Sequence, residues 1–242
     1  MRTALIALLL IATAAPLAGQ TPADTVRPGS AVLRTDHVTE SEHTMELTMQ
    51  ASPVPLQMVL STRLVERGGV PVIIRTERLR SGRSLLGTDS MTVERATLAP
   101  VQRVEYGGVW TRTEFTPRGV RVNDGVDKGV SRRLNAPVFL GSAFDLLLGA
   151  LPLAAGYEAV LPVWDSRDQV ATAATARVAG TEEVAFAAGT RSAWRVEVRG
   201  SGYAGTYWLD RESRTLLRYE SQDGRMRIVR RAAASATHRT SR

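Results

Sequence analysis

Two histidines near the start of the chain are the first residues that could bind a metal ion. His37 and His43 are six positions apart, and Glu46 follows His43 by three. A zinc centre needs three or four ligands fixed by surrounding groups, and an offset of three places His43 and Glu46 on opposite faces of a strand. His238 lies near the C-terminus, and the sequence offers no obvious third ligand. We therefore expect no metal site.

Arrangements for nucleophilic or acid–base catalysis are also missing. The chain has no G-x-S-x-G and no cysteine, so a serine nucleophile would have to recruit a histidine from the N-terminal strand region. Adjacent glutamates in a strand face opposite sides of the sheet, and acids around turns favour backbone capping over chemistry. Glu182 and Glu183 are such an adjacent pair, whereas Asp165 with Asp168 and Asp210 with Glu212 lie around expected turns. We expect no enzyme and no catalytic residue.

A glycine-rich hexapeptide, residues 200–205 (GSGYAG), matches the G-x-G-x-x-G pattern of dinucleotide-binding loops. That pattern binds phosphate where a strand precedes it and a helix follows it. Residues 206–210 (TYWLD) are instead typical of a strand, and the chain ends too soon for a nucleotide-binding unit. A connection or bulge between two strands is the expected role, and no cofactor is expected.

Large apolar side chains suggest a different kind of function, the binding of a hydrophobic ligand. The chain has four tryptophans, and methionines occur in its alternating N-terminal segments. Each of these side chains could equally be ordinary core, since aromatic residues are the normal filling of such sheets, whereas adaptable methionines suit a pliable pocket. The candidate ligand-binding residues are Trp110, Trp164, Trp208, Leu147 and Leu151.

The elements that would position these residues are mostly strands, because the dominant period of the sequence is two. Met45, Leu47 and Met49 alternate with polar residues, which predicts one face on a core and one in solvent, as in an antiparallel sheet. Gly68-Gly69 and Gly107-Gly108 separate such runs and indicate tight hairpins. Residues 123–135 are loop-like. Beyond the first run, the expected strands are 54–66, 70–79, 84–93, 100–106, 109–116, 120–122, 157–164, 170–179, 182–187, 191–199, 203–209, 214–220 and 225–230.

One helix is expected, over about residues 142–151. Ser142 with Asp145 three residues on is a capping signature, and Pro152 ends the apolar run. A short helix that is apolar nearly all round must be buried, most simply in the concave side of a curved sheet. The fold class is therefore mainly β: a single large curved antiparallel sheet or open half-barrel with one short buried helix.

Residues 1–20 have the layout of a secretory signal peptide. A positive Arg2 precedes an apolar run at 4–15, and small residues follow, so we expect cleavage near Gly19 or Gln20. An uncleaved membrane anchor is the alternative, but the apolar run is short for a bilayer and no longer one follows. We expect a periplasmic or secreted protein without a transmembrane segment after cleavage. It is not a lipoprotein, because there is no cysteine to carry the lipid.

The remaining chain is expected to fold as one unit. A flexible polar leader at 21–31 would precede a single antiparallel β domain at 32–231, and a disordered basic tail would follow at 232–242. The formal net charge of +7 is concentrated at the end of the chain, because residues 225–242 contain six arginines and no acid. We expect no nucleic-acid partner. The basic end is either a contact with anionic lipid or a solvated chain end.

Short motifs in a fixed order along residues 143–220 resemble a family of exported bacterial proteins known as a domain of unknown function. The motifs are Phe144-Asp145-Leu146-Leu147, Leu151-Pro152-Leu153, Gly156-Tyr157, Val178-x-Gly180-x-Glu182, Ala188-Gly189-Thr190, Ala193-Trp194-Arg195-Val196 and Tyr207-Trp208-Leu209-Asp210-x-Glu212-x-Arg214-x-Leu216. The sheet of that family is similar to that of the periplasmic lipoprotein carriers, in which a curved antiparallel sheet wraps short helices and an apolar ligand. The resemblance covers about a third of the chain and supplies no catalytic residue.

Two functions remain in view from the sequence. The first is an exported envelope protein that binds a lipid or another hydrophobic ligand in the concave side of its sheet, driven by burial of acyl carbons. The alternative is a non-enzymatic interaction or scaffold module that recruits another envelope protein through a surface or an edge strand.

Overall fold

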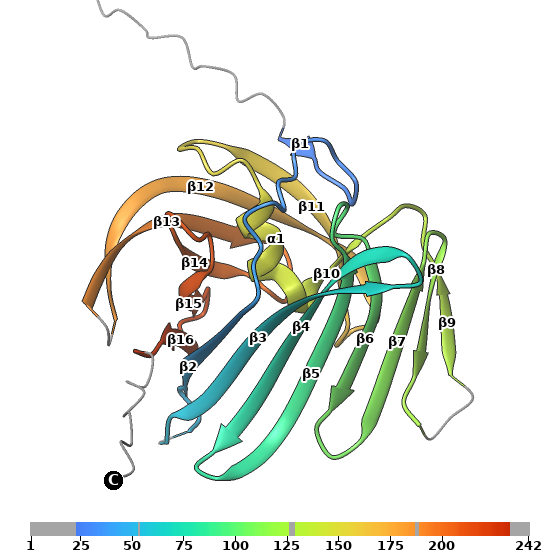
Figure 1. Cartoon of the computed structure of the whole chain (residues 1–242), viewed down its shortest axis with the longest axis horizontal. Coiled ribbons are helices and arrows are strands. Elements are labelled where there is room, and N and C mark those ends of the chain that lie inside the picture. Colours follow the sequence, from blue (N-terminus) through green and yellow to red (C-terminus); the bar gives the residue numbers. More distant parts are fainter. Residues whose placement is uncertain (1–22, 53, 126–128, 187–188, 233–242) are drawn as a thin grey trace, which may run out of the picture.

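The computed structural model describes residues 23–52, 54–125, 129–186 and 189–232 (Figure 1). The first 20 residues and nearly all of the expected tail therefore lie outside the described residues. The strands are β1 (Asp24–Thr25), β2 (Ser41–Met49), β3 (Leu56–Arg67), β4 (Val70–Ser81), β5 (Ser84–Glu94), β6 (Pro100–Tyr106), β7 (Trp110–Thr116), β8 (Gly119–Asn123), β9 (Val130–Arg133), β10 (Phe139–Leu140), β11 (Glu158–Asp165), β12 (Val170–Phe186), β13 (Gly189–Arg199), β14 (Gly205–Asp210), β15 (Leu216–Ser221) and β16 (Met226–Arg230). The helical elements are the 3-10 turn η1 (Gly141–Ala143) and α1 (Phe144–Ala150).

All of these strands form one sheet, built from two antiparallel meanders. Strands β2 to β9 pair in sequence order, and so do β11 to β16. The two meanders are joined by β16 and β2, which pair antiparallel with Ile228 opposite Leu47. The short strands β1 and β10 pair parallel to β11. The expected antiparallel sheet is thus confirmed for the long strands, and the sheet is mixed at its β11 edge.

The sheet curls around α1 without closing, which confirms the expected half-barrel with a buried helix (Figure 1). Leu147, Leu148 and Leu151 of the helix segment are almost fully buried and belong to the main core cluster. The same cluster takes Met45 and Ile73 from the inner faces of β2 and β4. The helix therefore adds apolar contacts to the inner faces of the sheet that curls around it.

The expected capping role of Ser142 is wrong. The residue at the N-cap of α1 is Ala143, and no side chain caps the helix. Ser142 already lies in the 3-10 turn, so its hydroxyl cannot reach the helix amides from an extended position. Asp145 in the first turn forms an ion pair with Arg75 of β4.

The glycine pairs act as the sequence predicted. Gly68 and Gly69 connect β3 to β4 with φ of +58° and +80°, the left-handed values that a primed hairpin turn requires. Gly107-Gly108 connects β6 to β7, and the glycine-rich residues 200–204 connect β13 to β14. The dinucleotide-loop pattern therefore lies in a strand connection, as expected.

Several elements differ from the expectation, and β10 was not expected at all. The leader expected to be flexible contains β1, and Val26 is 3% exposed with its amide 2.9 Å from the Val160 carbonyl oxygen. The loop expected at 123–135 contains β9, a polar and exposed strand without the alternation that would identify it. The two strands expected at 170–179 and 182–187 form one strand, β12, with a bulge between Val178 and Gly180.

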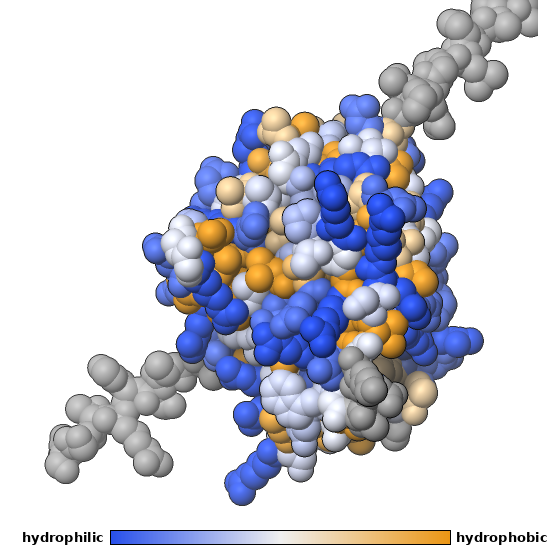
Figure 2. Space-filling view, turned by 90° about the vertical axis from the view of Figure 1, so that its right-hand side faces the viewer, coloured by the Kyte–Doolittle hydropathy of each residue, from blue (hydrophilic) through white to orange (hydrophobic). Residues whose placement is uncertain are grey.

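The outer surface is mainly hydrophilic on the face shown in Figure 2, with apolar residues in smaller patches. None of the helices in the described ranges is long and apolar enough to cross a membrane. Several exposed apolar side chains lie at the hairpin ends between β4 and β5 and between β6 and β7, namely Leu85, Leu86, Tyr106, Val109 and Trp110.

Replacing Leu148 by alanine tests whether α1 contributes to the core. Leu148 is 0% exposed, so the change should lower the free energy of unfolding by about 2–5 kcal/mol through lost burial and a cavity. Leu86→Ala is the matched control, because Leu86 is 46% exposed and its loss should cost within about 0.5 kcal/mol. Urea unfolding followed by circular dichroism measures both. Equal effects would contradict the buried position of the helix.

Candidate functional site

A cavity of about 340 Å³ lies on the concave side of the sheet, between α1 and the inner faces of the surrounding strands. Most of its wall is apolar, and one part carries ionisable side chains. The lining residues are Leu47, Met58, Leu60, Glu77, Asp89, Arg103, Gly141, Ser142, Phe144, Asp145, Gly202, Tyr203, Tyr207, Leu216, Tyr219, Met226 and Ile228. The size is that of a small-molecule binding site.

Four aromatic rings form one wall of this cavity. Phe144 stacks on Tyr203 at 5.9 Å between ring centres, and Tyr207 lies 4.6 Å from Tyr219. The Tyr207 hydroxyl donates to the Tyr203 carbonyl oxygen at 2.9 Å, and the Tyr219 hydroxyl donates to a carbonyl in the same connection. Because these hydroxyls are bound to backbone, the rings can contribute apolar surface. Gly141 allows this packing, since a Cβ there would lie 2.0 Å from the Tyr203 ring.

Charged groups from β4, β5 and β6 form the polar part. Glu77 lies opposite Asp89 across the β4–β5 pair. The Arg103 guanidinium donates to both Asp89 carboxylate oxygens, with Nε at 3.0 and 2.9 Å, and also pairs with Glu105 at 2.8 Å. Glu77 forms no hydrogen bond or ion pair with the other described residues. The cavity thus contains a carboxyl group that has no partner among the residues described in the structure.

The position of Glu77 changes its acidity. Burial is the main cause that raises the pKa of Glu77 to about 8, and the nearby Asp89 carboxylate adds to it. Burial also raises the pKa of Asp89, against the opposing effect of Arg103. At neutral pH the neutral form of Glu77 therefore dominates, and it could accept a hydrogen bond from a ligand through its carbonyl oxygen or donate one through its hydroxyl.

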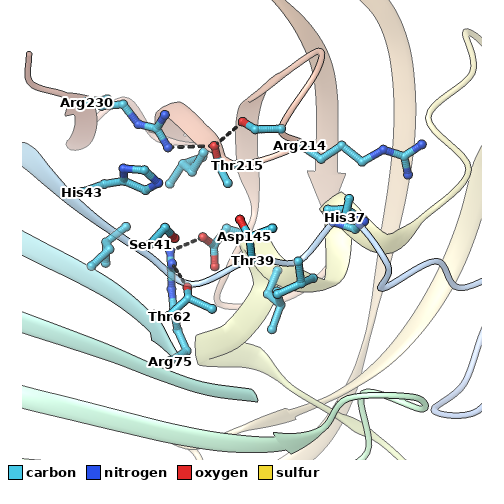
Figure 3. A pocket seen from close by; sticks show the side chains of 15 residues that line it. His37, Thr39, Ser41, His43, Thr62, Arg75, Asp145, Arg214, Thr215 and Arg230 are labelled. Carbon is cyan, nitrogen blue, oxygen red and sulfur yellow. Dashed lines mark hydrogen bonds and ion pairs between the residues drawn. The ribbon is translucent and has the colours of Figure 1, made fainter. Parts of the chain in front are cut away.

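A second, smaller cavity of about 30 Å³ adjoins the first and shares Leu60, Asp145 and Leu216 with it (Figure 3). Its remaining lining is strongly polar and includes two histidines and three arginines: His37, Val38, Thr39, Ser41, His43, Thr62, Arg75, Leu146, Ser213, Arg214, Thr215 and Arg230. Arg75 binds Asp145 and donates to the Thr62 hydroxyl at 2.9 Å, so this pair stands between the two cavities.

The tryptophans expected to line a ligand site lie in three different places. Trp110 begins β7 and is 59% exposed, beside Tyr106 at 6.1 Å. Trp164 is buried on the inner side and packs edge-on against Phe115. Trp208 belongs to a separate small cluster on β12 to β15, where its ring nitrogen donates to Glu182 and Arg218 covers its face at 4.4 Å. The structure does not bring these three residues together.

Leu147 and Leu151 are packed in the core, and neither they nor the tryptophans line the 340 Å³ cavity. The residues that do line it were missed because tyrosines and charged residues were not candidates. A signal was present: Arg75 and Glu77 are in phase with Ile73 and Leu79 along one strand, so charges share its inner face. Sequence alone does not say which face is inner.

The acids around turns cap backbone groups, as expected. Asp165 Oδ1 accepts from the amides of Arg167 and Asp168 at 2.9 and 3.3 Å. Asp210 Oδ1 does the same for Glu212 and Ser213 at 3.0 and 2.8 Å. Within the described part of the chain, no group of three or more His, Cys, Asp or Glu side chains is placed to bind a metal ion.

Comparison with known proteins identifies the family. The model of the family described as "Protein of unknown function (DUF3108)" matches residues 57–229, and the chain belongs to this family. No curated protein matches the chain. Among solved structures, a beta-barrel-like protein of domain of unknown function DUF1849 from Brucella abortus is similar, with 12% identity and a TM-score of 0.53. The match covers 79% of this chain and 95% of that one, and it supports the fold.

Replacing Glu77 by glutamine should change how stability depends on pH. Between its ordinary pKa of 4.5 and about 8, the folded protein retains a proton that the unfolded chain has released. Wild-type stability therefore falls as pH rises through this window, by up to about 1.4 kcal/mol per pH unit for one proton. Glu77→Gln lacks this loss, so its advantage over wild type should grow with pH in urea unfolding. A pH-independent difference between the two proteins would contradict the buried carboxyl.

Replacing Asp145 by asparagine should leave Arg75 charged in the interior, where the two side chains are 13% and 8% exposed. The expected loss in free energy of unfolding is about 3–5 kcal/mol. Glu114→Gln removes an exposed partner of Arg112 at 2.9 Å and should cost about 0–1 kcal/mol. Chemical unfolding of both variants makes the comparison, and a small effect for Asp145→Asn would show that Arg75 is solvated.

Proposed function

We propose that this member of the DUF3108 family binds a lipid or another hydrophobic ligand in the cavity on the concave side of its sheet. The observation that carries the proposal is the 340 Å³ space with an aromatic and aliphatic wall and a confined polar part. A cavity of this kind suits an amphipathic molecule, because apolar atoms gain about 0.8 kcal/mol per buried CH₂ group while one polar end can be recognised.

The side chains around the cavity are suited to a chain-like ligand. Met58, Met226 and Ile228 add flexible or branched apolar surface to the aromatic wall, and Ile228 pairs with Tyr219 across β15 and β16. Glu77, Asp89 and Arg103 lie together on β4 to β6, and the other charged lining residue, Asp145 of α1, is paired with Arg75 of β4. A ligand with one polar end and one long apolar part matches this separation better than a uniformly polar molecule does.

Export to the cell envelope belongs to the same proposal. The layout of residues 1–20 supports it, with cleavage near Gly19 or Gln20. The mass of the mature protein isolated from its own cells tests this part. A chain that retains Met1 and remains in the cytoplasm would overturn it, without affecting ligand binding.

Recruitment of another envelope protein is the second candidate function. The exposed apolar side chains at the hairpin ends favour it, since Tyr106, Val109 and Trp110 are all more than two-fifths exposed. Crosslinking in envelope extract with wild type and with Trp110→Ala tests it. A partner captured by wild type and lost in the variant would support this function, and equal recovery of background proteins alone would reject it.

Ligand binding predicts that a cavity-filling change will lower affinity. Native mass spectrometry of gently purified protein should show a discrete bound mass that is lost on denaturation. Ile228→Trp should lower the affinity for a hydrophobic fluorescent dye by about tenfold or more, because the indole occupies the cavity. Val170→Trp is the control, since Val170 is 46% exposed and does not line the cavity. Equal dye binding by both variants and a bare chain in the spectrometer would reject the function.

A further inference from the structure

The small cavity in Figure 3 contains an unusual number of nitrogen atoms without partners. Four of its lining side chains each have a buried nitrogen that forms no hydrogen bond: His37 Nδ1, His43 Nε2, Arg75 Nε and Arg230 Nε. Buried polar groups are normally paired, because an unsatisfied one has lost its hydrogen bonds to water without replacement. The Nε atoms of Arg75 and Arg230 are donors, and a neutral imidazole nitrogen can donate in one of its tautomers, so this small space is suited to receive an acceptor.

Three of these side chains come from neighbouring parts of the sheet. Arg230 is on β16, His43 on β2 and Arg75 on β4, and Figure 3 shows them along one side of the pocket, facing Asp145 of α1. Arg230 Nη2 donates to the Thr215 hydroxyl at 2.8 Å. The arrangement presents two guanidinium groups and an imidazole to the same space.

The positive charge of Arg230 has no ion-pair partner among the described residues. Two acids act on Arg230 from a distance, but Asp145 is bound by Arg75 and Asp210 by Arg191 at 3.0 Å. Arg214 does not supply charge to the centre of the pocket, since its guanidinium lies 3.3 Å from the Gly149 carbonyl oxygen. Asp145 is the one carboxylate among the described lining residues. The pocket therefore keeps excess positive charge.

We propose that this pocket binds an oxyanion, a carboxylate or phosphate group, with Arg230 and His43 as its direct contacts and Arg75 as the third donor. The volume of about 30 Å³ admits one small polar group and no acyl chain. The group could be the head of an amphiphile whose apolar part occupies the 340 Å³ cavity, or a free anion. The first source rests on the proposed function, and the second does not.

Charge in the pocket also determines the state of His43. Burial and then the charges of Arg230 and Arg75 lower the pKa of His43 to about 4, and Asp145 opposes this. An anion beside His43 would offset the two guanidinium charges and raise that pKa, so binding takes up a proton. Affinity for the anion should accordingly increase as the pH falls toward the pKa of His43.

Inorganic phosphate is the first probe, added to the full chain after delipidation. Calorimetry should detect one site, and the His43 pKa measured by NMR should rise on addition of phosphate. Arg230→Gln should weaken binding by about tenfold or more, since it removes a charge-assisted hydrogen bond. Arg231→Gln is the matched control. It removes the same charge one residue away, from a side chain that is 53% exposed.

Dodecanoate and dodecanol separate the two sources of the anion. If the anion is the head group of an amphiphile, dodecanoate should bind about tenfold or more tightly than dodecanol, and Arg230→Gln should abolish the difference while leaving dodecanol binding unchanged. If the anion is free, phosphate should bind in an Arg230-dependent way and the two amphiphiles should bind equally. If neither amphiphile binds but phosphate binds in an Arg230-dependent way, the hydrophobic-ligand function is rejected and the anion site is retained.

The proposal is overturned if wild type shows no response to phosphate in calorimetry or in the His43 titration and no preference for dodecanoate. This result needs no variant, so poor folding of Arg230→Gln cannot obscure it. Arg230→Lys gives a second check, since it retains the charge and should bind more tightly than Arg230→Gln. An equal loss of phosphate affinity in Arg230→Lys, Arg230→Gln and Arg231→Gln would also reject a specific contact with Arg230.

Discussion

Arg75 and Asp145 meet in the interior of the molecule, where both charges are largely removed from water and each depends on the other. Asp145 is in the first turn of α1, and Arg75 is in the middle of β4, so their ion pair attaches the helix to the concave side of the sheet. The Thr62 hydroxyl on β3 fixes the guanidinium further. The position of α1 relative to the strands determines where the apolar cavity ends and where the polar pocket begins.

The open sheet makes such an interior possible. The unclosed sheet curls around one short helix, which fills only part of the concave side and leaves space beside it. Charged side chains can then point inward along β4, β5 and β6 without being packed against apolar groups on all sides. Glu77 illustrates the consequence, since it lies deep in the molecule but still borders the cavity.

Under the two proposals, the two cavities would recognise different parts of a ligand, one through apolar surface and one through polar surface. Phe144 and the three tyrosines present aromatic carbon atoms to the cavity. The hydroxyl groups of Tyr207 and Tyr219 donate to backbone carbonyl oxygens. The pocket with Arg230 and His43 would favour an acceptor with negative charge, because the Nε atoms of Arg75 and Arg230 form no hydrogen bond within the described part of the chain. With the Arg75–Asp145 ion pair between these two surfaces, the proposed sites would distinguish molecules that have an acidic end from those that do not.

The sequence by itself determined the local elements. Alternation fixed most strands, glycine pairs placed the hairpins, and an apolar run bounded by Pro152 located the helix, because these features depend on neighbouring residues. It failed where tertiary contacts decide: Ser142 does not cap the helix, and residues 24–25 form a strand only because β11 is beside them. Alternation also does not say which face of a strand points to the core. Trp110 was therefore expected to line the interior, but it is exposed. Only the tertiary structure brought His43, Arg75 and Arg230 together, since a pocket made by residues from distant strands depends on sheet order and curvature, which local periodicity does not encode.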